Sequence, residues 1–499
     1  MNFNSLQFLI FLPTVLILYF ALPHKARWVV LLVASYYFYM SWNAWLVFLI
    51  LGTTAVSYAA AVAISKSKTA RGKKAWLAAT LVVCLGLLVF FKYFNFLIQS
   101  ATDFLNLFSL DIDSFALDII LPVGISFYTF QTLSYVIEVY RGKYAAEKHF
   151  GYYALFVCYF PQLVAGPIER PQDLIPQLKE KHRLNADDLA AGFRILLCGF
   201  LLKCVVADFC GIFVNNVFGN IGDANAVSVF AAGLLFYIQM FGDFAGYSLI
   251  ATGAARMMGV RLSRNFDRPY LAVSYSDFFR RWHITLTRWF TDYVYIPLGG
   301  NRKGTARRIV NTFVVFILCG LWHGANFTYV CWGLYAAFFV SLEAALRKPV
   351  KSLLKAHGID PHARPITIAR RVAMWLVFVP AALMFRSQSL AQFGEIFSKL
   401  FTACGGDGAY FGAAAASLGI DAISAIRLVL AIACMCLVHY IERYEKPTAA
   451  LPLGARAALA QRTYGSRAAV YFYAIFAVAF FWLALLASQD SSVFLYFQF

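Results

Sequence analysis

Long apolar runs separated by short polar turns make up most of this chain. The hydrocarbon core of a bilayer takes about 20 apolar residues of helix to cross. Most of the runs are close to that length, which predicts an all-α polytopic membrane protein. The candidate spans are residues 5–22, 28–42, 44–64, 76–97, 117–138, 151–168, 190–216, 227–257, 276–296, 309–323, 327–346, 370–386, 422–441 and 467–487.

Two of these runs are interrupted and predict broken or re-entrant helices. Residues 151–168 end in the sequence PQLVAGP, and proline removes a backbone donor and breaks a helix. Irregular backbone is not viable against lipid, so these pieces must be packed inside the protein or line a cavity. Residues 276–296 contain several ionisable side chains, namely Arg280, Arg281, His283, Arg288 and Asp292.

The composition supports the membrane assignment. The 499 residues are 61% hydrophobic and 14% charged, with a mean hydropathy of +0.66. Soluble proteins carry about 25% charged residues, so a soluble enzyme, a disordered tail and a small disulfide scaffold are excluded. The ten cysteines form no CxxC motif, and the eight that fall within apolar runs are expected to be buried thiols, with no metal site. We expect one integral membrane domain over residues 1–499.

The charge pattern predicts the orientation. The net charge of +18 comes from short basic loops between apolar runs, which is the positive-inside pattern and gives no reason to expect nucleic acid. The loops at 66–74, 302–308 and 347–355 are basic, whereas the loop after residue 97 carries aspartates. This arrangement predicts that the N-terminus lies outside the cell membrane. Residues 1–23 lack a basic start and a small-x-small cleavage site, and we interpret them as a retained helix.

Two amphipathic segments, Ala101–Leu117 and Leu390–Phe401, are candidates for helices on the membrane surface. An ordinary loop helix packed on the bundle is an equal alternative for each.

His323 is the first candidate for chemistry. It ends an apolar run that leaves the basic loop at 301–308, so a helix would carry it about 22 Å into the membrane. Gly324-Ala325-Asn326 then precede another apolar helix, which predicts a hairpin with His323 at its tip. A histidine at that depth needs a partner or water, which fits either a functional histidine or a structural one bonded to a carbonyl.

His283, in the sequence RRWH, is the second candidate, because neutral histidine can take a proton from a hydroxyl near neutral pH. Two histidines in one cavity could supply a base and a second group that binds the donor or acceptor. The neighbouring arginines suit the phosphates of a nucleotide thioester, an acidic carrier protein or anionic lipid headgroups. Asp243 is a secondary polar position within an apolar helix. The sequence contains no P-loop, HExxH or GxSxG motif.

Five blocks resemble the bacterial membrane-bound O-acyltransferases, the group that acts in alginate and peptidoglycan O-acetylation and in teichoic acid D-alanylation. The blocks lie within 121–333, and the helices at 370–499 match only in hydropathy. The matching sequences are LPVGISFYTFQTLSYVIEVYRG (121–142), FPQLVAGPIERPQDLIPQL (160–178), FYIQMFGDFAGYSLIATGAARMMG (236–259), NFDRPYLAVSYSDFFRRWHITLTRWFTDYVYIPLGGNRKG (265–304) and LCGLWHGANFTYVCWG (318–333).

The resemblance implies a ring of helices around a central funnel, with His323 as the catalytic histidine and His283 as a second functional histidine. Residues that we expect to bind substrate or donor are Arg280, Arg281, Trp282, Trp322, Asn326, Asp243 and Asp292.

The expected activity is transfer of an acyl group, first of all acetyl, from a cytoplasmic thioester such as acetyl-CoA to an extracytoplasmic polysaccharide. An alginate-like exopolysaccharide is the first expectation and peptidoglycan the second. D-alanyl transfer from a carrier protein and transport without chemistry are the alternatives. The resemblance further implies a bacterial inner membrane location, an extracytoplasmic SGNH-type acetyltransferase as partner, and no bound cofactor, because the thioester is already activated.

Overall fold

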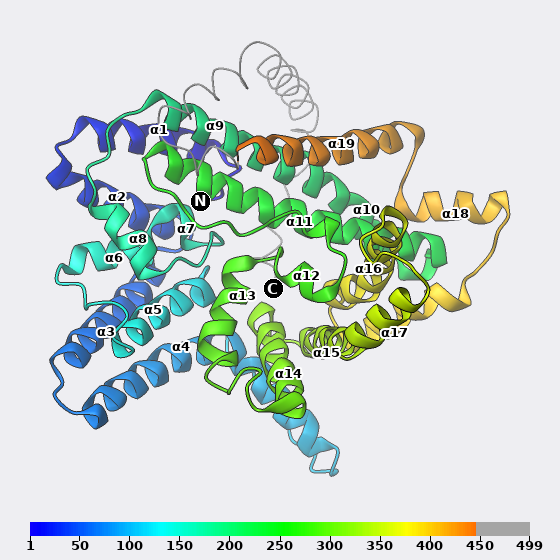
Figure 1. Ribbon diagram of the computed structural model, residues 1–499, viewed down its shortest axis with the longest axis horizontal. Helices are drawn as coiled ribbons and strands as arrows, with labels where there is room; N and C mark the ends of the chain where they lie inside the picture. The colour runs from blue at the N-terminus through cyan, green and yellow to red at the C-terminus, as the bar shows by residue number, and fades with distance from the viewer. Residues whose placement is uncertain (446–499) are drawn as a thin grey trace. The chain divides into compact units, whose positions relative to one another are not determined.

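The computed structural model describes residues 1–445, and every regular element within them is a helix (Figure 1). These residues form two compact units, which confirms the all-α class. Within the described residues, unit 1 comprises Met1–Phe193 and Ala251–Arg371, and unit 2 comprises Arg194–Ile250 and residues 372–445.

The helices of unit 1 are mostly consecutive in sequence. They are α1 (Leu6–Ala21), α2 (His24–Met40), α3 (Val47–Lys66), α4 (Ala70–Asn106), α5 (Ile125–Tyr140), α6 (Phe150–Cys158), α7 (Phe160–Leu163), α8 (Pro171–Lys179), α12 (Tyr275–Phe279), α13 (Ile284–Phe290), α14 (Gly304–His323) and α15 (Phe327–Ala356). Helices α9 (Ala186–Phe200), α11 (Ala226–Met257) and α16 (Arg364–Arg386) each contribute to both units. Unit 2 also contains α10 (Asp208–Gly219), α17 (Leu390–Thr402), α18 (Gly408–Leu418) and α19 (Ala422–Glu445).

Within the described residues, eight helical segments are long and apolar enough to cross a membrane. This number is smaller than the number of apolar runs, because several runs do not form one long helix. Helices α1 and α2 have 16 and 17 residues, and the run at 117–138 becomes helical only at Ile125. The run at 467–487 lies outside the described residues.

The predicted surface helix at Ala101–Leu117 is wrong. Its first residues extend α4 to Asn106, and residues 107–124 contain no helix. The side chain of Asn106 accepts a hydrogen bond from the Ile112 nitrogen and donates to the Ile112 oxygen, at 2.8 and 3.0 Å, which draws the chain out of the helix. Residues Leu390–Phe401 do form an amphipathic helix, α17, which Ser389 caps.

Both predictions of broken helices are confirmed. Residues 151–168 divide into α6 and α7, because Tyr159 leaves the helical conformation immediately before Phe160-Pro161. Residues 276–296 divide into α12, α13 and a π-helical turn at Thr291–Tyr295. Between α12 and α13 the backbone of His283 is left-handed, with φ of 44°.

Helices α14 and α15 form the predicted hairpin, and α14 ends at His323. Glycines allow the two backbones to approach closely. A Cβ atom on Gly320 would lie 2.1 Å from the Tyr329 carbonyl oxygen, and one on Gly333 would lie 2.4 Å from the Phe316 carbonyl oxygen. A Cβ atom on Gly324, at the turn, would lie 2.2 Å from the Tyr329 ring.

We predict that Gly320→Ala disrupts the hairpin, because backbone atoms of α15 cannot move aside as a flexible side chain could. The expected result is loss of monodisperse protein in detergent or a lower unfolding temperature. Gly86→Ala in α4 is the matched control, since a Cβ there meets nothing within 4 Å. Alanine favours a helix over glycine by about 1 kcal/mol, so Gly86→Ala should not lower the stability. Equal stability losses in the two variants would contradict the close-packing interpretation.

Candidate active site

His323 occupies the buried end of the α14 helix, at the tip of the hairpin. Its Nε2 atom lies 4.0 Å from the Cys319 Sγ atom one helical turn earlier. The ring of Trp332 on α15 meets the imidazole edge-on, with ring centroids 5.4 Å apart. Groups from both arms of the hairpin therefore contact the imidazole.

His283 is held by the side chain of Asn265, and this contact determines which ring nitrogen carries the proton. The Thr285 backbone nitrogen, which can only donate, lies 3.4 Å from Asn265 Oδ1. The Thr285 hydroxyl accepts from the Ile168 nitrogen at 3.1 Å and donates to Asn265 Oδ1 at 2.9 Å. These contacts identify the amide atom as oxygen, an acceptor.

The same oxygen lies 3.1 Å from His283 Nδ1, so Nδ1 must be the protonated nitrogen. Burial lowers the pKa of His283 well below 6.5, and the neighbouring His323 lowers it further. The neutral ring therefore carries its basic lone pair on Nε2. The arrangement leaves His283 in a single tautomer suited to accept a proton or a hydrogen bond.

Trp322 brings the two histidines together. Its indole ring lies 5.5 Å from the His283 ring and 5.0 Å from the His323 ring, centroid to centroid, and meets both edge-on. Phe127 of α5 stacks against His283 and packs edge-on against Trp322. The structure thus places both predicted histidines against one aromatic ring, although forty residues separate them in the sequence.

The RRW residues before His283 have different surroundings. Arg280 is exposed, and its Nε atom donates to the Ser276 oxygen. Arg281 pairs with Asp277 at 3.0 Å. Trp282 is buried between aromatic rings and packs on Phe278 at 5.4 Å. Of these three predicted binding residues, Arg280 has the most accessible charge.

Two other predicted residues have clear structural contacts. Asn326 caps the start of α15, where its side-chain oxygen accepts from the Thr328 nitrogen at 2.9 Å. Asp243 belongs to unit 2 and pairs there with Lys203 at 2.6 Å.

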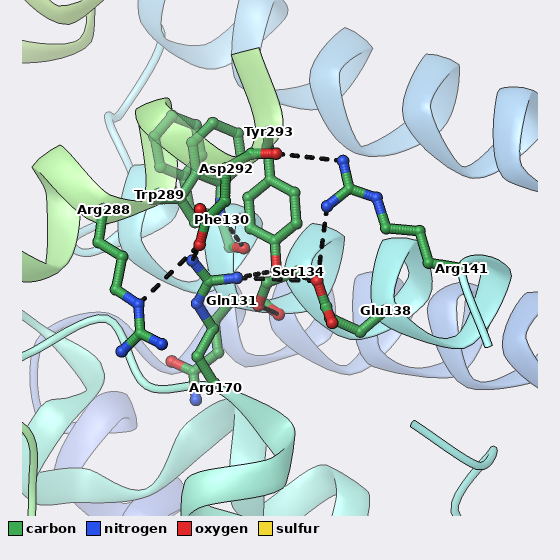
Figure 2. Close-up of polar contacts among 10 residues, drawn as sticks. All are labelled: Phe130, Gln131, Ser134, Glu138, Arg141, Arg170, Arg288, Trp289, Asp292 and Tyr293. Atoms are coloured by element: carbon green, nitrogen blue, oxygen red, sulfur yellow. Dashed lines mark hydrogen bonds and ion pairs between the residues drawn. The ribbon is translucent and has the colours of Figure 1, made fainter. Parts of the chain in front are cut away.

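Asp292 lies in a charged cluster that sequence reasoning missed, the Arg170 cluster of Glu138, Arg141, Arg170, Asp292 and Tyr293 (Figure 2). Arg170 pairs with Asp292 at 2.7 Å and with Glu138 at 3.8 Å. Tyr293 contacts Arg170 and donates to Glu138 at 3.0 Å. Arg141 pairs with Glu138 at 3.7 Å. The cluster joins α5, the segment before α8 and the π-helical turn after α13.

An aromatic contact links the same elements next to the cluster. Trp289 of α13 stacks on Phe130 of α5 with ring centroids 3.8 Å apart, and its indole nitrogen donates to the Phe130 oxygen (Figure 2). Phe130 also contacts the Trp322 ring at 6.0 Å. The cluster and this stack thus fix α13, the helix that begins directly after His283.

Glu169 is a second residue that the sequence did not reveal. It is buried and accepts hydrogen bonds from the Ser263 nitrogen and hydroxyl, at 2.5 and 2.9 Å. Burial raises the pKa of Glu169 to about 7, and the two bonds from Ser263 oppose the rise. This contact ties the segment containing Asn265 to the loop before α8. The blocks that carry the family resemblance include Glu138, Glu169 and Arg170. Their place in these blocks was the one sign in the sequence that they could matter to the site.

Comparisons with known proteins agree with the motifs. A model of the membrane-bound O-acyltransferase family matches residues 146–385. The chain is 36% identical to a probable alginate O-acetylase of Pseudomonas aeruginosa, over 81% of this chain and 75% of that protein. It is 33% identical to a peptidoglycan O-acetyltransferase of Helicobacter pylori, over 78% of this chain and 77% of that protein. A teichoic acid D-alanyltransferase of Bacillus subtilis is 29% identical, over 44% of this chain and 58% of that protein.

The Arg170 cluster generates a stability prediction. Arg170→Met removes the central cation and leaves two carboxylates without their shared partner, which costs about 3 kcal/mol for a buried ion pair. Arg288→Met removes another arginine facing Asp292, but that side chain is 63% exposed and 3.9 Å away, so its cost is below about 1 kcal/mol. Thermal unfolding of both variants in detergent measures the difference. Equal effects would contradict a supporting role for Arg170.

Proposed function

Because this chain belongs to the membrane-bound O-acyltransferase family, we propose that it transfers an acetyl group from acetyl-CoA toward the hydroxyl groups of an extracytoplasmic polysaccharide. The protein is a multi-pass membrane protein and an O-acyltransferase. The observation that carries the proposal is the placement of two buried histidines, His283 and His323, against the single ring of Trp322.

We assign proton removal from the nucleophile to His323. In acyl transfer an oxygen–carbon bond forms and the carbon–sulfur bond of the thioester breaks. The hydroxyl proton passes to the imidazole and then to the departing thiolate, so one histidine serves both proton transfers. The buried position near the end of a hairpin holds the imidazole in place, and positioning together with proton transfer supplies most of the acceleration.

His283 has a separate part in this proposal. Its Nδ1 proton is engaged by Asn265, so Nε2 is the atom that orients the donor or a hydroxyl of the acceptor. No metal or bound cofactor is part of the mechanism, because a thioester is already activated for attack. The proposal needs only the two imidazoles and a cavity that admits the substrates.

The similarity to alginate O-acetylases favours an alginate-like exopolysaccharide as acceptor, with peptidoglycan second. D-alanyl transfer from a carrier protein is a weaker proposal, since the similarity to those enzymes covers less than half of the chain.

We further propose a bacterial inner membrane location with the N-terminus outside. The donor then enters from the face with the basic loops, and a separate SGNH-type transferase completes the modification outside the membrane. The exposed Arg302 and Lys303 lie in one such loop, and the exposed Arg307 lies in the first turn of α14. Their charges suit the phosphates of coenzyme A.

His323→Ala is predicted to abolish acetyl transfer, because it removes the imidazole to which this proposal assigns proton removal from the hydroxyl. The measurement is release or transfer of radiolabelled acetyl from acetyl-CoA by the purified protein in detergent. His362→Ala, in an exposed loop, is the matched control and should keep full activity.

Full activity of the His323→Ala protein would contradict the assignment of the base. If the unsubstituted protein shows no turnover, the assay is repeated with a candidate extracytoplasmic partner and with an acyl-carrier donor. Activity with the acyl-carrier donor alone would contradict acetyl-CoA as the donor, and continued inactivity with both donors would favour transport without chemistry.

Asn265→Asp is predicted to shift the pH dependence of transfer. A carboxylate beside Nδ1 stabilises the imidazolium, so the pKa of His283 rises and the ring stays protonated to a higher pH. Since the proposal requires neutral His283, the acidic limb of the rate profile should move to higher pH. An unchanged acidic limb in a folded, active variant would contradict a role for the Nε2 lone pair.

A further inference from the structure

The end of α14 is hydrogen bonded by two consecutive residues of α4. The last four carbonyl groups of a helix have no partner within the helix. In α14 the Gly320 oxygen accepts from the Gly324 nitrogen at 3.4 Å, and the Leu321 oxygen accepts from the Tyr93 hydroxyl at 2.7 Å. Lys92 Nζ donates to the remaining two, the Trp322 oxygen at 2.6 Å and the His323 oxygen at 3.1 Å.

These bonds contribute more to stability inside a membrane than they would in water. Lys92 lies in the apolar part of α4, where an ammonium group is costly unless it is paired. The negative end of the α14 dipole favours a cation at this terminus, and Lys92 satisfies two carbonyls with one amino group. These carbonyls belong to Trp322 and His323 themselves, so the two bonds hold the backbone from which both rings project.

We infer that Lys92, assisted by Tyr93, is a positioning residue that fixes the backbone of Trp322 and His323 and thereby sets the position of the reacting imidazole. The inference rests on the proposed function of His323. Lys92 acts on the backbone of the two residues and not as a proton donor or acceptor in the reaction. Its loss therefore affects how well His323 is placed, while the binding of acetyl-CoA is retained.

Kinetics of Lys92→Met in detergent test this inference. A misplacement of about 1 Å costs about 100-fold in rate, so kcat should fall by up to about 100-fold while KM for acetyl-CoA changes less than about twofold. Lys92→Arg keeps a cationic donor and should recover a substantial part of kcat. Lys181→Met, the same substitution at an exposed position outside the basic loops, is the matched control and should behave as the unsubstituted protein.

Tyr93→Phe keeps the test decisive if Lys92→Met does not fold. It removes one hydroxyl and one bond to α14, and kcat should fall by less than in the lysine variant, again without a change in KM. A second readout is the rate at which diethyl pyrocarbonate modifies His323, measured by peptide mass spectrometry. This rate should rise in both variants, because a loosened helix end exposes the ring.

His323→Ala is assayed in parallel to separate this inference from the proposed function. An active His323→Ala protein overturns the proposed function. An inactive His323→Ala protein together with unchanged kcat in Tyr93→Phe and in folded Lys92→Met overturns the role of Lys92. A loss that appears only in KM, or that Lys92→Arg does not relieve, also overturns it.

Discussion

Backbone that ends or bends inside a membrane protein must find hydrogen-bond partners within the protein, because lipid supplies none. The described part of unit 1 meets this requirement at each point where a helix stops near the two histidines. The end of α14 takes partners from α4. After His283, the Ile284 and Thr285 nitrogens donate to the backbone and side-chain oxygens of Asn265. The candidate site is therefore located where the helices are interrupted.

The interruption at His283 shows what such an arrangement costs. A left-handed conformation at a residue other than glycine costs about 1–2 kcal/mol. Here the neighbouring backbone is fixed on both sides, since the Ile284 nitrogen donates to the Asn265 oxygen at 2.9 Å and the Asp267 nitrogen donates to the Arg281 oxygen at 2.8 Å. Strain of this kind persists only where the surroundings determine the conformation, and it is common at functional sites.

Much of the fold could be predicted from the sequence, because apolar length and proline position are local properties. The hairpin ending at His323 and the breaks within 151–168 and 276–296 are confirmed. The segment after Asn106 could not be predicted from amphipathic spacing, because its path depends on side-chain amides that pair with the backbone. The runs that form helices of 16 and 17 residues show that an apolar run does not by itself give the length of its helix.

The candidate site was only partly predictable, and the reason is physical. His283 and His323 stand out because ionisable groups in apolar surroundings are costly and therefore informative. Their supports do not stand out: Asn265 looks like a loop residue, and Lys92 is one lysine within an apolar run. Each becomes informative only when its partner, distant in sequence, is known. A residue that acts through the backbone of another leaves no local pattern, and it is the structure that connects Lys92 to a histidine 231 positions later.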